Sequence, residues 1–301
     1  VTYTNEAIMA FIPKGNYEVS PDYFFYMLSG RDWSKGTNRA VMGVTLNKAT
    51  LGEIDVIIPP FDKQCQVAAV LDKVGDLISL RKQQLIKMDE AVESRFIELF
   101  GDPVNNDRQW GTQTLDSVCA TIVDCPHSTP SYTSENTGFM CIRTSIVKKN
   151  RILWDEIEYI SEREYKQRIQ RKRPAKGDIV YTREGAILGI AAMIDRECNV
   201  ALGQRSMLLS PNTSKCLPEF LSTAMNFDSF LRKVLGGVSG SASPHINVGD
   251  IKAFEIILPP ISIQTQFAAF VEVTGKSKLT IQQSLDKLEV LKKALVQEYF
   301  G

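Results

Sequence analysis

The chain has 301 residues, of which 44% are hydrophobic and 23% charged, and this length suits two or three compact units that can each bury a core. Its 35 basic residues balance 35 acidic residues, so net charge gives no support for nucleic-acid binding and only local basic clusters can supply it. No apolar run reaches the roughly 18 residues of a membrane helix and no signal-peptide pattern opens the chain, so we expect a cytoplasmic protein with no membrane partner.

A repeat with an offset of 200 residues organises the chain. Residues 59–101 align with residues 259–301 without a gap, and 13 of the 43 positions are identical. Just upstream, the run IDVIIPP pairs with the run FEIILPP. Residues 1–60 therefore correspond to the last part of residues 102–260, and about the first 100 residues of the second unit have no counterpart. The sequence predicts one partial and one complete copy of the same unit, each followed by the repeated segment.

Each repeated segment predicts a long helix. The Pro-Pro pair ends a short run of Ile and Val, since proline cannot continue a β ladder, and apolar residues then recur with the seven-residue period of a coiled coil. About 38 residues at ~1.5 Å each make a rod of about 57 Å, with a bend expected at Gly75 and Gly275. We expect the two helices to pack together, either as a spacer or as a hairpin that only holds domains together. The predicted seam positions are Leu71, Val74, Ile78, Leu85, Met88, Val92 and Leu99, and Val271, Thr274, Ile281, Leu285, Leu288, Leu295 and Tyr299.

Residues 102–260 read as a mixed α/β unit. Helices are expected at Ser161–Gln170 and at Pro218–Val234, the second with a proline in its first turn. The loops Val123–Thr133 and Gly236–Pro244 are rich in Ser, Gly and Pro, which is typical of surface loops with adaptable polar groups. Strands are expected at Gly138–Arg143, Asp178–Tyr181, Ile190–Ile194, Ser206–Leu209 and Phe254–Leu258.

No motif for catalysis is found. A Walker-type GxxxxGK[ST] sequence is absent, as are the glycine-rich loop and the Asn/Asp-Pro-Pro-Tyr/Phe pocket of an adenine methyltransferase. Asp178 and Glu184 are not followed by the Glu-x-Lys that a magnesium-dependent nuclease would use, and the six cysteines form no Cys-x-x-Cys pair. We therefore expect no catalytic site, no metal and no cofactor, and reduced, mostly buried thiols.

Local clusters indicate a binding surface. Residues 162–176 hold seven basic side chains against two acidic ones, which suits phosphates, although a solvated helix face would look the same. Forked or amide side chains beside loops suit base edges. The phosphate candidates are Lys35, Arg39, Lys148, Lys149, Arg168, Arg171, Lys172 and Arg173. The base-reading candidates are Arg143, Arg183, Gln204, Arg205 and Ser241.

The whole pattern resembles the DNA specificity (S) subunits of type I restriction-modification systems. The resemblance covers nearly all of the chain and rests on the repeat together with four runs: DCPHSTP at 124–130, CIRTSIV at 141–147, KGDIVYTREGAILG at 176–189 and FEIILPPISIQTQ at 254–266. It implies a mixed α/β fold with two target recognition domains separated by two long antiparallel coiled-coil helices. The implied parts are a partial first domain at 1–60, a central conserved helix at 61–101, a second domain at 102–260 and a distal conserved helix at 261–301.

The resemblance also implies a function. Each recognition domain reads one half of a split double-stranded DNA site, and the helices dock methyltransferase subunits. S-adenosylmethionine, ATP and magnesium would be bound by the methyltransferase and restriction subunits, so this chain would guide the reaction without catalysing it. Because the chain opens with Val1 in what reads as mid-strand, we expect either a fragment or a short subunit that pairs with a copy of itself. The alternatives are the specificity module of a fused methyltransferase-nuclease and a coiled-coil scaffold that binds no DNA.

Overall fold

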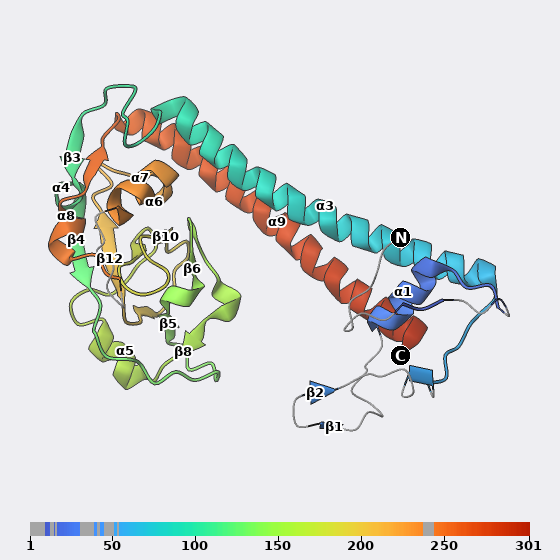
Figure 1. Cartoon of the computed structure of the whole chain (residues 1–301). Coiled ribbons are helices and arrows are strands. Elements are labelled where there is room, and N and C mark those ends of the chain that lie inside the picture. Colours follow the sequence, from blue (N-terminus) through green and yellow to red (C-terminus); the bar gives the residue numbers. More distant parts are fainter. Residues whose placement is uncertain are drawn as a thin grey trace. The chain divides into compact units, whose positions relative to one another are not determined.

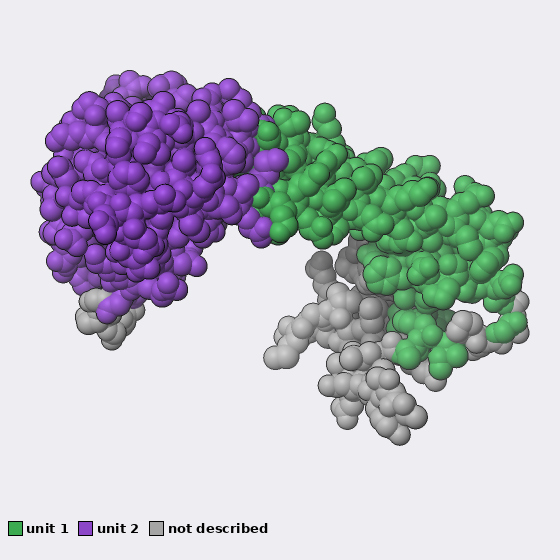
Figure 2. Space-filling view, turned by 90° about the horizontal axis from the view of Figure 1, so that it is seen from above, with its two compact units in different colours: residues 1–87, 277–301 green, residues 88–276 purple. Residues whose placement is uncertain are grey.

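The computed structural model describes residues 10–12, 15, 17–30, 39–40, 43–44, 51–52, 54–236 and 244–301. The chain divides into two units, which are coloured separately in Figure 2. Unit 1 comprises Val1–Lys87 and Ser277–Gly301, and unit 2 comprises Met88–Lys276. Within the described part of the chain, no helix is long and apolar enough to cross a membrane.

The two expected long helices are present. Helix α3 spans Phe61–Phe100 and α9 spans Ile261–Phe300, and each runs without interruption through its glycine and contributes to both units. They lie side by side in Figure 1. Their contacts are antiparallel: in unit 1 Lys82 Nζ lies 2.9 Å from Glu289 Oε1, and in unit 2 the rings of Phe96 and Phe267 are 5.4 Å apart. The expected antiparallel pair is therefore confirmed.

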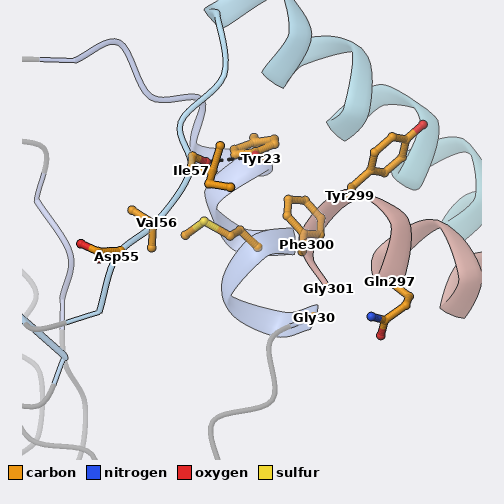
Figure 3. Close-up of a pocket in the computed structure, with 10 residues that line it drawn as sticks. Tyr23, Gly30, Asp55, Val56, Ile57, Gln297, Tyr299, Phe300 and Gly301 are labelled. Carbon is orange, nitrogen blue, oxygen red and sulfur yellow. Dashed lines mark hydrogen bonds between the residues drawn. The ribbon is translucent and has the colours of Figure 1, made fainter. Parts of the chain in front are cut away.

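Unit 1 is organised around α1 (Pro21–Gly30), which packs on the long helices. Leu71, predicted as a seam position, is fully buried there, together with Tyr23 and Met27 of α1. The short strands β1 (Arg39–Ala40) and β2 (Gly43–Val44) pair antiparallel. In unit 1 the apolar seam between the two long helices is thus covered by a third helix, α1, whose Tyr23 faces the end of α9 in Figure 3, and the heptad pattern alone does not predict this helix.

A buried glutamine joins α1 to α3. Gln64, in the first turn of α3, is 0% exposed, and its Oε1 accepts a hydrogen bond of 2.8 Å from the backbone N–H of Ser20, directly before α1. Its Nε2 donates to the carbonyl oxygens of Pro59 at 2.8 Å and Glu18 at 2.9 Å. One amide therefore satisfies three backbone groups that the Pro-Pro turn and the start of α1 leave without helical partners.

Unit 2 repeats this arrangement. Gln264 is also 0% exposed, and its Oε1 accepts a hydrogen bond of 2.8 Å from the backbone N–H of Leu217, directly before α6 (Pro218–Asn226). Its Nε2 donates to the carbonyl oxygens of Pro259 at 2.8 Å and Lys215 at 3.1 Å. The repeat seen in the sequence thus extends to individual hydrogen bonds, and α1 is the counterpart of α6.

The centre of unit 2 is a four-stranded antiparallel sheet in the order β10-β9-β12-β4. Beside it lies a three-stranded sheet in the order β11-β5-β8, in which β11 and β5 are parallel. The bounds of these strands are Cys119–Asp124 (β4), Met140–Ile142 (β5), Glu158–Tyr159 (β8), Ile179–Thr182 (β9), Ala191–Met193 (β10), Val200–Leu202 (β11) and Ser206–Pro211 (β12).

Shorter elements complete unit 2. Strand β3 pairs with β13 and β6 with β7, both antiparallel. The bounds of these elements are Thr112–Thr114 (β3), Leu115–Val118 (α4), Thr144–Ile146 (η1), Val147–Lys148 (β6), Arg151–Ile152 (β7), Trp154–Glu156 (η2), Glu162–Arg168 (α5), Asp228–Leu235 (α7), Val248–Lys252 (α8) and Glu255–Ile257 (β13).

Side-chain alternation explains how the central sheet is covered. Tyr181 and Met207 face a core that includes helices α6 and α7 and the phenylalanines of α3 and α9. Val180 and Leu208, their chain neighbours, face the other core, which includes Ile142 of the second sheet. The central sheet is therefore buried on both faces.

The predicted elements match unit 2 with one exception. Each of the five predicted strands overlaps an observed strand, and the helix predicted at Ser161–Gln170 is α5, with Ser161 as its N-cap. The single helix predicted for Pro218–Val234 is wrong, because Phe227 is extended (φ −63°, ψ 139°) and separates α6 from α7. The buried Asn226 amide donates to Asn150 Oδ1 and to the Ala191 carbonyl, both at 2.7 Å, and ties the end of α6 to the sheet.

Replacement of the buried glutamine tests its role. Gln264→Leu leaves one backbone N–H and two carbonyls buried without partners, so we expect the free energy of unfolding to fall by about 2–4 kcal/mol in urea denaturation. The control is Gln266→Leu, an exposed glutamine on the same helix, which should change it by less than about 0.5 kcal/mol. Equal losses in both variants would contradict this account.

Candidate nucleic-acid interface

Four loop segments of unit 2 meet at one end of its central sheet. Three backbone hydrogen bonds join them: the N–H of Cys125 donates to the Ser206 carbonyl at 3.2 Å, that of Arg183 to Arg205 at 3.1 Å, and that of Gly185 to Pro244 at 3.1 Å. We call this region the loop edge. It comprises residues 124–131, 183–186, 203–205 and 244–246.

Arg183 and Asp124 form the internal brace of the loop edge. The Arg183 side chain is 7% exposed, and its Nε and Nη2 lie 3.0 Å and 3.2 Å from the two carboxylate oxygens of Asp124. Nη2 also lies 2.7 Å from Glu184 Oε1. Two carboxylates thus engage a guanidinium that is largely shielded from solvent, and a base contact by Arg183 stays a prediction that would require these ion pairs to open.

Arg168 has a comparable internal role. Its side chain is only 3% exposed, and Nη2 donates to the Ser128 carbonyl at 2.7 Å while Nη1 donates to the Leu202 carbonyl at 3.2 Å. Its Nε lies 3.4 Å from Glu164 Oε1 on the same helix. Arg168 therefore connects α5, the loop after β4 and the end of β11, and its role as a phosphate contact stays a prediction that would require these bonds to break.

The remaining polar side chains of the loop edge face solvent. Arg205 is exposed, and its φ of 69° places it in the left-handed region that few side chains adopt outside turns and functional sites. Its neighbour Gln204 accepts a hydrogen bond of 3.1 Å from Thr129 Oγ1. His127 is exposed, with Nε2 3.2 Å from Asp124 Oδ2. These side chains place guanidinium, amide, hydroxyl and imidazole groups on loops whose backbone is held by the Arg183–Asp124 ion pair and by backbone hydrogen bonds.

Of the two other base-reading candidates, the structure describes one. Arg143 is partly exposed, lies over the Tyr132 ring at 5.3 Å and has its Nε 3.2 Å from Glu158 Oε2. Ser241 lies outside the described residues. The structure therefore brings Gln204 and Arg205 together and leaves Arg143 next to a carboxylate.

The basic segment after α5 contains two exposed arginines and one lysine that forms an ion pair with a buried carboxylate. Arg171 is exposed and donates to the Asp124 carbonyl at 3.2 Å, and Arg173 is exposed and donates to Asn199 Oδ1 at 2.9 Å. Lys172 is instead bound to the buried Asp178 carboxylate at 3.0 Å. Two of the three predicted phosphate contacts are thus open to solvent, and Lys172 stabilises the start of β9.

Of the other four phosphate candidates, the side chains of two are described. Lys148 donates to the Ser145 carbonyl at 2.7 Å, and Lys149 forms an ion pair with Asp228 at 2.6 Å. Lys35 lies outside the described residues, and only the backbone of Arg39 is described, in β1. A phosphate contact by any of these four residues stays a prediction.

The loop edge has none of the usual signs of a nucleophile or metal site. Among the described residues, no group of three or more His, Cys, Asp or Glu side chains is placed to hold a metal ion. Burial raises the pKa of the Cys125 thiol, whose sulfur accepts a hydrogen bond from the Ser206 N–H, so the thiol stays protonated at neutral pH. The geometry provides a surface that can bind and orient a ligand.

Comparison with known proteins identifies the family. A family model described as "Type I restriction modification DNA specificity domain" matches residues 1–89 and 108–291. The chain belongs to this family. Among its relatives is the type I restriction enzyme MjaIX specificity subunit of Methanocaldococcus jannaschii, which is 22% identical over 97% of this chain and 71% of its own length. The MjaVIII specificity subunit of the same organism is 20% identical over 88% of this chain and 68% of its own length.

Solved structures share the fold of these specificity subunits. The S subunit from M. genitalium superposes with a TM-score of 0.54 at 12% identity, covering 93% of this chain and 72% of that chain. A chain from a type I restriction-modification system, solved to explain complex assembly and conformational transition, gives 0.54 at 18% identity and covers 93% and 68%. The mixed α/β fold with two long helices is therefore the fold of the family.

The brace can be tested separately from the exposed side chains. Asp124→Asn removes the carboxylate that contacts both Nε and Nη2 of the buried Arg183 guanidinium and leaves Glu184 as its counter-charge, so we expect the free energy of unfolding to fall by about 1–3 kcal/mol in thermal or urea denaturation. Arg205→Ala removes an exposed side chain of the same loop edge and should change stability by less than about 0.5 kcal/mol. A stable Asp124→Asn protein would show that the ion pair does not brace the loops.

Proposed function

We propose that unit 2 is a target recognition domain whose loop edge reads one part of a double-stranded DNA site. The observation that carries this proposal is the pair of the partly exposed Gln204 and the exposed Arg205 on loops braced by the largely buried Arg183–Asp124 pair. A side chain that reads bases must be held in position before DNA arrives, because ordering a mobile loop reduces the affinity. Family membership supports DNA sequence specificity over a scaffold that binds no DNA.

The exposed arginines after α5 suit the DNA backbone. Phosphate contacts fix the position of a protein on the duplex but carry no sequence information, whereas base edges are distinguished by forked and amide groups. Arg171 donates a hydrogen bond to the Asp124 carbonyl in the loop edge. Asp124 would therefore help to position both the phosphate-binding arginine and the base-reading loops. Arg143 stays a second base-reading candidate if Glu158 releases it.

Catalysis would belong to partner subunits. We propose that methyltransferase subunits dock on the long helices, bind S-adenosylmethionine and methylate a bipartite target, and that restriction subunits supply the ATP-dependent and magnesium-dependent steps. Large apolar side chains exposed on these helices support docking, since such groups often mark protein interfaces. They are Leu77, Leu80 and Ile86 on α3 and Leu279, Val290 and Leu291 on α9. A methyltransferase-nuclease fusion carrying this module would use the same surfaces.

The first test measures how DNA binding depends on salt. Arg171→Ala combined with Arg173→Ala should weaken binding to all sequences and reduce the slope of log K against log salt by up to about 2, since each phosphate contact contributes about 0.9. Fluorescence anisotropy with a labelled duplex gives the slope. Lys233→Ala, which removes an exposed lysine paired with Glu255, is the control and should leave the slope unchanged. An unchanged slope in the double variant would assign the two arginines to a solvated face.

The second test concerns sequence preference. Arg205→Ala, co-expressed with the methyltransferase subunit, should relax the preference at one base pair and cost about 1–3 kcal/mol there, because a bidentate contact with guanine is lost. The measurement is the consensus of methylated sites in the cell. Arg205→Lys, which keeps the charge without the fork, should also relax it. A uniform loss of methylation with an unchanged consensus would reassign Arg205 to the DNA backbone.

A further inference from the structure

The loop after β4 is held in place on both sides of His127. On one side Asp124 contacts the Arg183 guanidinium, with Oδ1 3.0 Å from Nε. On the other side the Ser128 carbonyl accepts a hydrogen bond of 2.7 Å from Nη2 of Arg168. The two arginine side chains are 7% and 3% exposed, whereas the side chain of His127 is 66% exposed. Two shielded guanidiniums thus hold the backbone around one imidazole that faces solvent.

The contact with Asp124 decides which nitrogen of the imidazole carries the proton. Nε2 of His127 lies 3.2 Å from Asp124 Oδ2, and an ionised carboxylate can only accept a hydrogen bond. When the ring is neutral, its single proton therefore stays on the nitrogen next to the carboxylate, and the other nitrogen is an acceptor. Uptake of a second proton turns that outer nitrogen into a donor. The outer edge of His127 thus has two opposite hydrogen-bonding states.

These two states suit different base edges. In the major groove the amino groups of adenine and cytosine donate, whereas guanine O6 and N7 and thymine O4 accept. The neutral ring of His127 therefore suits adenine or cytosine, and the doubly protonated ring suits guanine or thymine. The loop of His127 is joined to the base-reading candidates, because Thr129 Oγ1 donates to Gln204 Oε1 at 3.1 Å. The guanidinium of Arg205 beside it only donates, so it has no such change of state.

The ionisable groups packed around this loop leave histidine as the group that titrates near neutral pH. The Cys125 thiol stays protonated because burial raises its pKa. Carboxylates and guanidiniums ordinarily keep their charge between about pH 5.5 and pH 8, whereas histidine does not. The chain has a second histidine, His245, on the segment that bridges to Glu184. The charged side chains on the segments around the loop are Asp124, Glu164, Arg168, Arg171, Arg183, Glu184 and Arg205.

We propose that His127 is a base-reading residue whose preferred base changes with pH. At neutral pH its outer nitrogen accepts a hydrogen bond from the amino group of an adenine or a cytosine, and after protonation the same nitrogen donates to a guanine or a thymine. Asp124 is the positioning residue, because it orients the ring and selects the nitrogen that carries the first proton. This inference rests on the proposed function, to which it adds one contact of the loop edge with DNA.

The test uses the full chain, co-purified with the methyltransferase subunit, and a library of randomised double-stranded DNA. Bound duplexes are selected at about pH 8 and at about pH 5.5 and then sequenced. One position of the consensus should favour adenine or cytosine at the higher pH and move toward guanine or thymine at the lower pH, by the roughly two- to tenfold that one hydrogen bond provides. In His127→Gln the amide offers a donor and an acceptor at both pH values, so this change should disappear.

The matched control is His245→Gln, which should retain the pH-dependent change of base. Both histidines are exposed, so both variants should fold and keep the melting temperature of the parent chain. A consensus that is the same at both pH values, or a change that His127→Gln retains, would overturn the inference and leave the proposed function intact. Tighter binding of all duplexes alike at the lower pH would also overturn it, since His127 would then contact phosphate. Selection of no consensus at either pH would overturn the proposed function as well.

Discussion

The structure depends on a constraint at the start of each long helix. The Pro-Pro turn removes backbone donors, and the helix that packs beside it begins with N–H groups that no helical carbonyl can satisfy. Gln64 and Gln264 each meet both needs with a single buried side-chain amide. Its oxygen accepts a hydrogen bond from one backbone N–H, and its nitrogen donates to two backbone carbonyls. Because α1 and α6 are positioned by these bonds, so are the phenylalanine and tyrosine rings that close each end of the paired helices.

Much of this architecture could be predicted from the sequence, because helices leave a periodic signal. The seven-residue spacing predicted two long helices of about 38 residues, and each observed helix has 40. The sequence shows that Gln64 aligns with Gln264, but it does not show what these side chains bind, since two of the three partners of each lie 44 to 49 residues away. The break at Phe227 also escaped prediction, because it depends on where the Asn226 amide meets β10 in the folded sheet and not on local helix propensity.

The site was predicted less well, and the reason is physical. An arginine beside a loop has the right chemistry for DNA whether it points out or in. The side chains of Arg168 and Arg183 point into the protein, toward carboxylates and carbonyls that lie as far as 63 residues away along the chain, so no local pattern distinguishes them from the exposed Arg205. Asp124, which joins Arg183, Arg171 and His127, was not predicted as part of the site at all. The available signals were its place in the predicted loop Val123–Thr133 and at the start of the run DCPHSTP.

The division between inward and outward arginines has a consequence for how such a protein changes over generations. The groups that hold the loops in place, Asp124, Arg168 and Arg183, are largely shielded from solvent, whereas Gln204 and Arg205 support little of the fold. Substitutions at the outward positions leave the buried ion pairs intact, so they are nearly neutral for folding. If Gln204 and Arg205 read bases as proposed, new sequence preferences are accessible by single substitutions that keep the protein folded, because the buried ion pairs beneath them stay the same.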